Sequence, residues 1–344
     1  MAKEKALVIC PGRGTYNASE LGYFHKHHSN KKEFLASLDA LRAETGQAAI
    51  SALDAADAHK VSVHGTGDNA SLLIYACALA DFMDIDRDRF DIACVTGNSM
   101  GWYLALAAAG ALSLSDGAML VNTMGTLMHE EADGGQVVYP IVDENWNADP
   151  AKIATVNTVI EGAKAKSDCD VHISIRLGGM IVLAANKAGL SYLKSTLPAQ
   201  EHFPMLLRHH AAFHSPILDP IVGRAQSMLS ADMFGGPSIP MVDGEGRVWN
   251  NASTDVDALY DYTLGAQINR TYDFSKAVEV ASKEFAPDRI IILGPGTTMG
   301  GATAQSLIPH AWRGMTDKAS FLSLQKSDPY IIAMGMDDQR ALVV

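Results

Sequence analysis

The sequence is poor in cysteine, and none of its cysteines forms a CxxC pair. Four occur among 344 residues, and Cys10, Cys77 and Cys94 lie inside apolar runs, where a buried free thiol is the usual state. No cluster of histidines, cysteines and carboxylates has the spacing of metal ligands, so we expect no metal. Unpaired thiols suit a reducing compartment, and we expect a cytoplasmic protein.

Long apolar runs and positive charge are also scarce. The first apolar run, residues 6–10, stops at Pro11 and is too short for a signal-peptide core or a membrane span. Lys and Arg number 27 against 39 Asp and Glu, a net charge of −12. Such an acidic surface repels nucleic acid and anionic membranes, so we expect neither as a partner.

The remaining pattern is that of a globular α/β enzyme. Short apolar runs at residues 6–10, 91–96 and 289–293 each lead into a glycine-containing loop, which predicts buried strands whose carboxyl ends carry functional loops. Helices are predicted near residues 32–44, 70–83 and 102–109. Another is predicted over 116–131, with Ser115 as its N-cap.

The pattern changes from residue 134 to residue 204. Strands are predicted at 136–142, 171–176 and 180–184, with helices at 150–166 and 190–197 and a last strand near 203–207. This βαββα order is typical of a ferredoxin-like unit. We therefore expect a large α/β domain made of residues 1–133 and 205–344, with an inserted subdomain at 134–204.

The best candidate for a nucleophile is Ser99, in the GNSMG segment at residues 97–101. A strand, GxSxG and a helix form a nucleophile elbow, in which glycines permit a sharp turn that exposes the serine hydroxyl. The helix N-terminus that follows makes the Met100 amide a candidate oxyanion donor. Short GxSxG strings also arise by chance, and the alternative is a capping serine in a plain strand-to-helix turn.

A serine nucleophile needs a base, and the chain has twelve histidines. His25, His27 and His28 form a cluster with no acidic or cysteine neighbours, so we expect them on a solvated surface. His214 lies where an apolar stretch ends before Pro216, in a loop like that of Ser99. Its local pattern alone favours a core or capping histidine.

Five segments taken together resemble the malonyl-CoA:acyl-carrier-protein transacylase family. They are PGRG at 11–14, GNSMG at 97–101, AGALS at 109–113, AFHSP at 212–216 and LGPG at 293–296, and they follow that family's order over about residues 6–308. The resemblance implies an α/β hydrolase-like large domain with a ferredoxin-like insertion. It also implies acyl transfer between acyl-CoA and an acyl carrier protein, without a bound cofactor.

The resemblance also implies roles for individual residues. Ser99 takes the acyl group, and His214, oriented by a backbone carbonyl, deprotonates first Ser99 and then the thiol of a phosphopantetheine arm. Gln267 matches a glutamine near the family's active site. The loop at Arg13 supplies the second oxyanion amide beside Met100.

Several positions depart from the family's usual residues. Asn98 stands in place of a histidine, Trp102 of a glutamate and Arg13 of a glutamine. Met124 aligns with the arginine that holds the malonyl carboxylate, and burying that charge without a partner costs several kcal/mol. We therefore expect an uncharged acyl group, acetyl or longer, unless Arg13 or Arg176 provides a substitute anchor.

Two other functions fit the same residues. Water in place of a carrier thiol would make the chain an acyl-thioester hydrolase, with Ser99 and His214 unchanged. The altered family positions also suit a noncatalytic scaffold that binds a partner. The sequence does not set the acyl chain length, the pathway or the oligomeric state.

Overall fold

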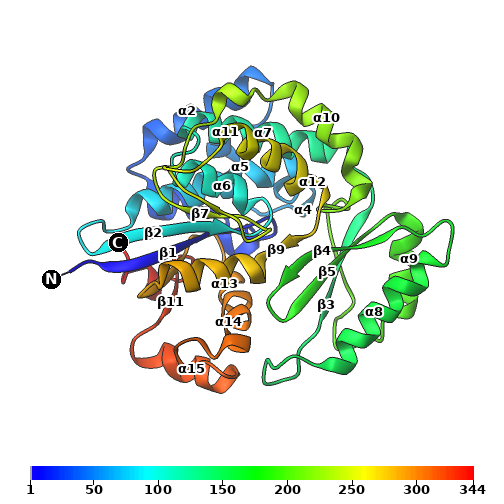
Figure 1. The fold of residues 1–344 in the computed structure, drawn as a ribbon. Coiled ribbons are helices and arrows are strands. Elements are labelled where there is room, and N and C mark those ends of the chain that lie inside the picture. The colour runs from blue at the N-terminus through cyan, green and yellow to red at the C-terminus, as the bar shows by residue number, and fades with distance from the viewer. Residues whose placement is uncertain (1) are drawn as a thin grey trace.

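The large part of the molecule is built on a six-stranded sheet in the order β11-β10-β1-β2-β7-β8 (Figure 1). The computed structural model describes residues 2–344. The strands are β1 (Glu4–Cys10), β2 (Phe90–Gly97), β7 (Met241–Val242), β8 (Val248–Trp249), β10 (Arg289–Ile292) and β11 (Ile331–Ala333). All neighbours pair in parallel except β7 and β8. The apolar runs at the centre are fully buried because helices cover both faces.

Helices lie on both sides of this sheet, with α5, α6 and α7 on one side and α13 and α14 on the other (Figure 1). The helices of this part are α1 (Tyr23–His28), α2 (Lys32–Glu44), α3 (Ile50–Asp54), α4 (Val61–His64), α5 (Gly67–Asp84), α6 (Gly101–Ala108), α7 (Leu114–Glu130), α10 (Asp219–Met228), α11 (Val256–Asp261), α12 (Gln267–Asn269), α13 (Phe274–Phe285), α14 (Met299–Leu307), α15 (Lys318–Ser327) and α16 (Asp337–Arg340). One expected cap is wrong. Ser113, not Ser115, caps α7, because its hydroxyl accepts the amide of Asp116 at 3.0 Å while Ser115 already lies in the first turn.

A second sheet, in the order β6-β3-β5-β4-β9, lies beside the first (Figure 1). Its elements are β3 (Gly135–Pro140), α8 (Pro150–Lys164), β4 (Val171–Leu177), β5 (Met180–Ala185), α9 (Lys187–Thr196), β6 (Met205–Leu207) and β9 (Tyr272–Asp273). The first four strands of this order form the expected ferredoxin-like antiparallel sheet, and α8 and α9 pack on it around a core of their own. The sheet extends past residue 204, because β6 pairs with β3 and β9 joins at the other edge.

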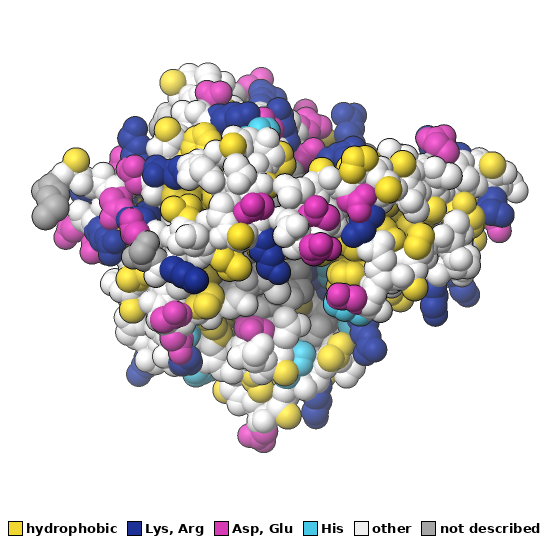
Figure 2. Space-filling view, turned by 90° about the horizontal axis from the view of Figure 1, so that it is seen from below, with side chains coloured by type: hydrophobic (Ala, Val, Ile, Leu, Met, Phe, Trp, Pro, Cys, Tyr) yellow, Lys and Arg dark blue, Asp and Glu magenta, His cyan; other side chains and the backbone are white. Residues whose placement is uncertain are grey.

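The surface mixes both signs of charge. Figure 2 shows acidic and basic side chains interspersed over the face that is seen from below, with a hollow near its middle. Within residues 2–344, no helix is long and apolar enough to cross a membrane.

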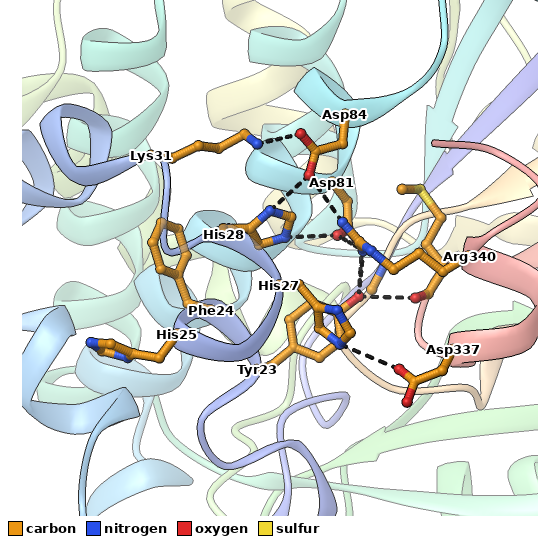
Figure 3. A network of polar contacts seen from close by, with 12 residues as sticks. Tyr23, Phe24, His25, His27, His28, Lys31, Asp81, Asp84, Asp337 and Arg340 are labelled. Atoms are coloured by element: carbon orange, nitrogen blue, oxygen red, sulfur yellow. Dashed lines mark hydrogen bonds and ion pairs between the residues drawn. The ribbon is translucent and has the colours of Figure 1, made fainter.

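One histidine of α1, His28, takes part in a buried ion network, which corrects the expectation that all three are solvated (Figure 3). His28 is fully buried, and its Nε2 lies 2.9 Å from Asp81 and its Nδ1 3.0 Å from Asp84. Both carboxylates come from α5, far along the chain, so the local sequence around His28 gave no sign of them. Arg340 of α16 pairs with the same two carboxylates.

The network ties the C-terminal helix to the carboxyl end of β10. Asp81 is fully buried and also accepts hydrogen bonds from the Tyr23 hydroxyl at 2.8 Å and the Gly294 amide at 2.7 Å. Gly294 begins the loop after β10, which lies on the same side of the sheet as the loop after β1. The network therefore supports the edge of the sheet that carries the candidate site.

We expect Arg340→Ala to lower the free energy of unfolding by about 3 kcal/mol or more, because it leaves the Asp81 charge buried without its cation. Urea denaturation followed by circular dichroism measures this change. The matched control is Lys26→Ala, which removes an exposed ion pair with Asp337 and is expected to cost less than about 1 kcal/mol. Equal effects of the two substitutions would contradict the structural role given to the network.

Candidate active site

Ser99 occupies a strained turn between β2 and α6. Its φ of 57° lies in the left-handed region, which serine seldom adopts unless the surrounding structure holds the backbone there. A Cβ at Gly97 would lie 2.2 Å from the Gly101 carbonyl group, and one at Gly101 would lie 2.3 Å from the carbonyl oxygen of Cys10. Glycine at both positions therefore allows β1 to pass directly behind the turn, which holds the serine hydroxyl away from the backbone.

His214 contacts the nucleophile directly. Its Nε2 lies 2.6 Å from the Ser99 Oγ, and its Nδ1 lies 2.6 Å from the backbone carbonyl oxygen of Gln267. A carbonyl oxygen only accepts, so Nδ1 of His214 carries the proton. Nε2 then has a free lone pair, which accepts a hydrogen bond from the serine hydroxyl. Burial lowers the pKa of His214 to about 4, which keeps the ring neutral at pH 7.

Gln267 connects the nucleophile and the histidine. It follows a π-helix at Tyr262–Ala266, and its side chain is almost fully buried. The side-chain amide donates to the Ser99 carbonyl at 3.0 Å, while its oxygen accepts the Tyr103 hydroxyl at 2.6 Å. Sequence reasoning missed Tyr103, although it lies one helical turn after Ser99 and its position was a usable signal.

Two backbone amides beside Ser99 are available as hydrogen-bond donors. Those of Met100 and Arg13 donate to no other residue in the described chain, and both residues line the cavity at Ser99. The loop carrying Arg13 comes this close because a Cβ at Gly12 would lie 2.6 Å from the Asn98 carbonyl oxygen. The arrangement suits an oxyanion that forms at a carbon attacked by Ser99.

A small cavity of about 50 Å³ opens from Ser99 toward α7. Val121, Met124 and Met128 give it an apolar wall. The Ser71 hydroxyl in the same cavity already donates to the Gly67 carbonyl at 2.6 Å, and the Tyr103 hydroxyl donates to Gln267. These two hydroxyls are satisfied within the protein, so the wall on the side of α7 offers a ligand little beyond apolar contact.

Arg13 is the cation that lines this cavity. Its Nη2 donates to the carbonyls of Gly65, at 3.0 Å, and His209, at 2.9 Å, and the guanidinium lies 5.6 Å from the centre of the Phe213 ring. Burial lowers its pKa to about 10, so it remains charged at pH 7. Arg176, the other expected substitute, is half exposed, lies 3.6 Å from Asp273 and lines neither this cavity nor the wider groove described next.

A wider groove of about 300 Å³ reaches Ser99 from the second sheet. Most of its wall is apolar, and its polar lining includes Asn98, Gln136 and His210. Sequence reasoning missed the last two, because it did not show which face of the second sheet turns toward Ser99. Trp102, which stands in place of the family's glutamate, lines neither space. It is fully buried, and its indole donates to Thr263 at 3.0 Å, so it packs the core behind the turn.

The described residues contain no group of three or more histidines, cysteines and carboxylates arranged to hold a metal ion. The four cysteines are free, and Cys10, Cys77 and Cys94 are buried as their apolar surroundings indicated. The groups around Ser99 that can take part in chemistry include the neutral His214 ring and the backbone amides of Met100 and Arg13.

Comparison by sequence finds similarity to segments of much longer fungal proteins. No family model matches the chain. It is 28% identical over 211 residues to the non-reducing polyketide synthase nscA of Arthroderma gypseum, and 27% identical over 244 residues to that of Arthroderma benhamiae. These matches cover 61% and 70% of the chain but only 11% and 13% of the synthases. The chain thus spans a small fraction of the length of these relatives.

Comparison by structure finds similarity over nearly the whole chain. The malonyl-CoA:ACP transacylase of Synechocystis superposes with a TM-score of 0.73 at 16% identity, and the acyl-carrier-protein S-malonyltransferase of Burkholderia pseudomallei with 0.74 at 19%. Both comparisons cover 98% of this chain and 99% of the other. A malonyl transacylase solved in complex with a type II polyketide synthase carrier protein gives 0.71 at 18%, over 89% of this chain and 93% of the other. The resemblance indicated by the sequence motifs is therefore confirmed, and this chain has the fold of the malonyl-CoA:acyl-carrier-protein transacylases.

Proposed function

We propose that this chain is an acyltransferase that carries its acyl group on Ser99. The observation that supports this most directly is the 2.6 Å contact between the Ser99 hydroxyl and a His214 ring whose tautomer is set by the Gln267 carbonyl. The names of the structural neighbours, which describe transfer of malonyl groups to carrier proteins, agree with it.

The geometry suits a two-step transfer. In the first step the Ser99 Oγ attacks the thioester carbonyl carbon and its proton passes to the His214 Nε2, while the Met100 and Arg13 amides hold the oxyanion. The tetrahedral adduct then expels the thiol, which takes the proton from His214. In the second step a different thiol gives its proton to His214 and attacks the acyl-serine carbonyl carbon. The adduct then expels the Ser99 Oγ, which takes the proton back from His214, and the acyl group leaves on the new thiol.

The donor and acceptor are acyl-CoA and the phosphopantetheine arm of an acyl carrier protein. A transacylase of this fold has been solved with its carrier, which supports a carrier as the partner. The acyl group travels on the substrate, so the reaction needs no resident cofactor. A hydrolase would run the same first step and differ only in admitting water to the second.

The acyl group is short and uncharged. A space of about 10–15 Å³ holds one water, so the cavity of about 50 Å³ beside Met124 has room for about four non-hydrogen atoms. Its wall is apolar, and the Ser71 and Tyr103 hydroxyls donate elsewhere. A carboxylate placed there could not form a bidentate pair with Arg13 unless Nη2 gave up a bond that it already makes. An acetyl or propionyl group fills the space without bringing a charge that must be paired.

Incubation with acetyl-CoA should add one acetyl group to the protein, and Ser99→Ala should abolish this adduct, as measured by intact-protein mass spectrometry. A carrier protein with a phosphopantetheine arm should then discharge the wild-type adduct and become acetylated. Release of acetate without a carrier would identify a hydrolase. Absence of both adduct and acetate with acetyl-, malonyl-, hexanoyl- and longer acyl-CoAs would support the noncatalytic scaffold.

The rate of Ser99 acylation at low acetyl-CoA should be constant from about pH 6 to about pH 8 and fall on acidification with a midpoint near pH 4. The active form is the neutral ring, and because burial lowers the pKa of His214, that form persists to lower pH than for an exposed histidine. Circular dichroism at each pH checks that the fold is intact. A midpoint near the ordinary histidine pKa of about 6.5 would contradict the buried neutral base.

Met124→Arg should raise the ratio of kcat/KM for malonyl-CoA to that for acetyl-CoA by about 10-fold or more, since a guanidinium at this point can pair with the malonyl carboxylate. Met124→Leu is the matched control, and its ratio should stay within about 2-fold of wild type because it keeps the apolar wall. A wild-type preference for malonyl-CoA would show the uncharged assignment to be wrong and leave Arg13 as the anchor.

A further inference from the structure

A second histidine, His210, lines the groove that leads to Ser99. It precedes His214 by one short loop and plays no part in the proton transfers described above. Its Nδ1 lies 2.7 Å from the side-chain oxygen of Gln136, a buried residue of β3. The ring is only partly buried, and no described residue donates to its Nε2.

The direction of every hydrogen bond behind this ring follows from one backbone carbonyl. The Phe213 carbonyl can only accept, so the Ser174 hydroxyl donates to it at 2.7 Å. Having used its single proton, Ser174 accepts from the Gln136 side-chain NH₂ at 2.6 Å. Gln136 must then turn its oxygen toward His210, and Nδ1 of His210 must carry the proton.

The chain of bonds therefore fixes a lone pair on the Nε2 of His210, the opposite edge of a ring that lines the groove. Burial, together with the nearby charge of Arg13, lowers the pKa of His210 well below its ordinary value. The ring stays neutral at pH 7 and cannot donate from Nε2. Nε2 can therefore only accept a hydrogen bond, and the residue that carries it lines a groove whose walls are mostly apolar.

We propose that His210 binds the pantetheine arm of the substrate by accepting a hydrogen bond from one of the arm's amide N–H groups. This inference rests on the proposed function, which makes arm-bearing thioesters the substrates. The arm must approach Ser99 through a space wider than the acyl cavity, and the groove lined by His210 is such a space. An apolar groove that takes up amide N–H groups needs an acceptor to replace the water they lose.

Two substitutions separate the two edges of the ring. His210→Asn places an amide nitrogen near the position of Nδ1, which keeps the bond to Gln136 and removes the acceptor from the groove. His210→Gln places an amide oxygen near the position of Nε2, which keeps an acceptor in the groove and gives up the bond to Gln136. The readout is the ratio of kcat/KM for Ser99 acylation by acetyl-CoA to that by p-nitrophenyl acetate, an ester that has no arm.

We expect this ratio to fall about 5-fold in His210→Asn, mainly through a higher KM for acetyl-CoA, and to stay within about 2-fold of wild type in His210→Gln. An unchanged ratio in His210→Asn would overturn the inference, because a merely structural role affects both esters alike and cancels in the ratio. An equal fall of the ratio in both variants would also overturn it, because His210→Gln keeps the acceptor. The aryl ester also shows whether each variant keeps a working Ser99. Acylation of wild type by p-nitrophenyl acetate but by no acyl-CoA would instead count against the proposed function and remove the basis of the inference.

Discussion

The candidate site depends on a close backbone contact between the ends of β1 and β2. These strands are parallel neighbours, so their carboxyl ends meet at one edge of the sheet. Glycines at 12, 97 and 101 let the loop after β1 and the turn after β2 approach to distances that any Cβ would prevent. The contact brings Arg13 and Met100 to the cavity at Ser99. It also holds Ser99 in a left-handed conformation that costs about 1–3 kcal/mol.

The histidine is held from both parts of the molecule. From the large part, Gln267 accepts its Nδ1–H and the Ile268 carbonyl accepts its backbone amide at 3.0 Å. From the second sheet, Ser174 donates to the carbonyl of Phe213, the residue before it. His214 has a φ of 55°, so its backbone is strained like that of Ser99. Two strained residues in contact, each fixed by several hydrogen bonds, are easier to explain in a working site than in a scaffold that has lost its chemistry.

The sequence predicted much of the fold because its strands and helices carry strong local signals. The apolar runs gave β1, β2 and β10, and the βαββα order gave the ferredoxin-like sheet. The short strand β11 was missed, although residues 330–334 form an apolar run as long as that at residues 6–10 and were a usable signal. The buried role of His28 was also missed, but it had no such signal. Its carboxylate partners lie on α5, and nothing near His28 in the sequence reveals them.

The site was predicted only in part, again because local signals can be read from the sequence and contacts between distant segments cannot. GxSxG with its flanking elements is a local signal for a turn, and it singled out Ser99 and the Met100 amide. Pairing with His214 depends on contacts across the fold, so the residues alone left that histidine ambiguous until the family resemblance was added. Trp102 shows the limit of position as a guide. It comes three residues after Ser99, on the side of α6 that faces the core, and it packs against Tyr262 instead of substrate.

Whether Arg13 can hold a charged acyl group depends more on the hydrogen bonds that its guanidinium already makes than on its positive charge. A carboxylate pairs best with two N–H groups that point the same way, and each such edge of a guanidinium includes Nη2. Nη2 already donates to the Gly65 and His209 carbonyls, which use both of its protons. A bidentate pair with malonyl would leave one of these carbonyls without its donor, at a cost of about 1–3 kcal/mol if it stays buried. An uncharged acyl group beside Met124 leaves both bonds in place, but it also leaves the buried Nε of Arg13 without a hydrogen-bond partner. The bonds of Nη2 therefore weigh against a bidentate carboxylate, whereas a single contact from Nε to a carboxylate would break neither of them.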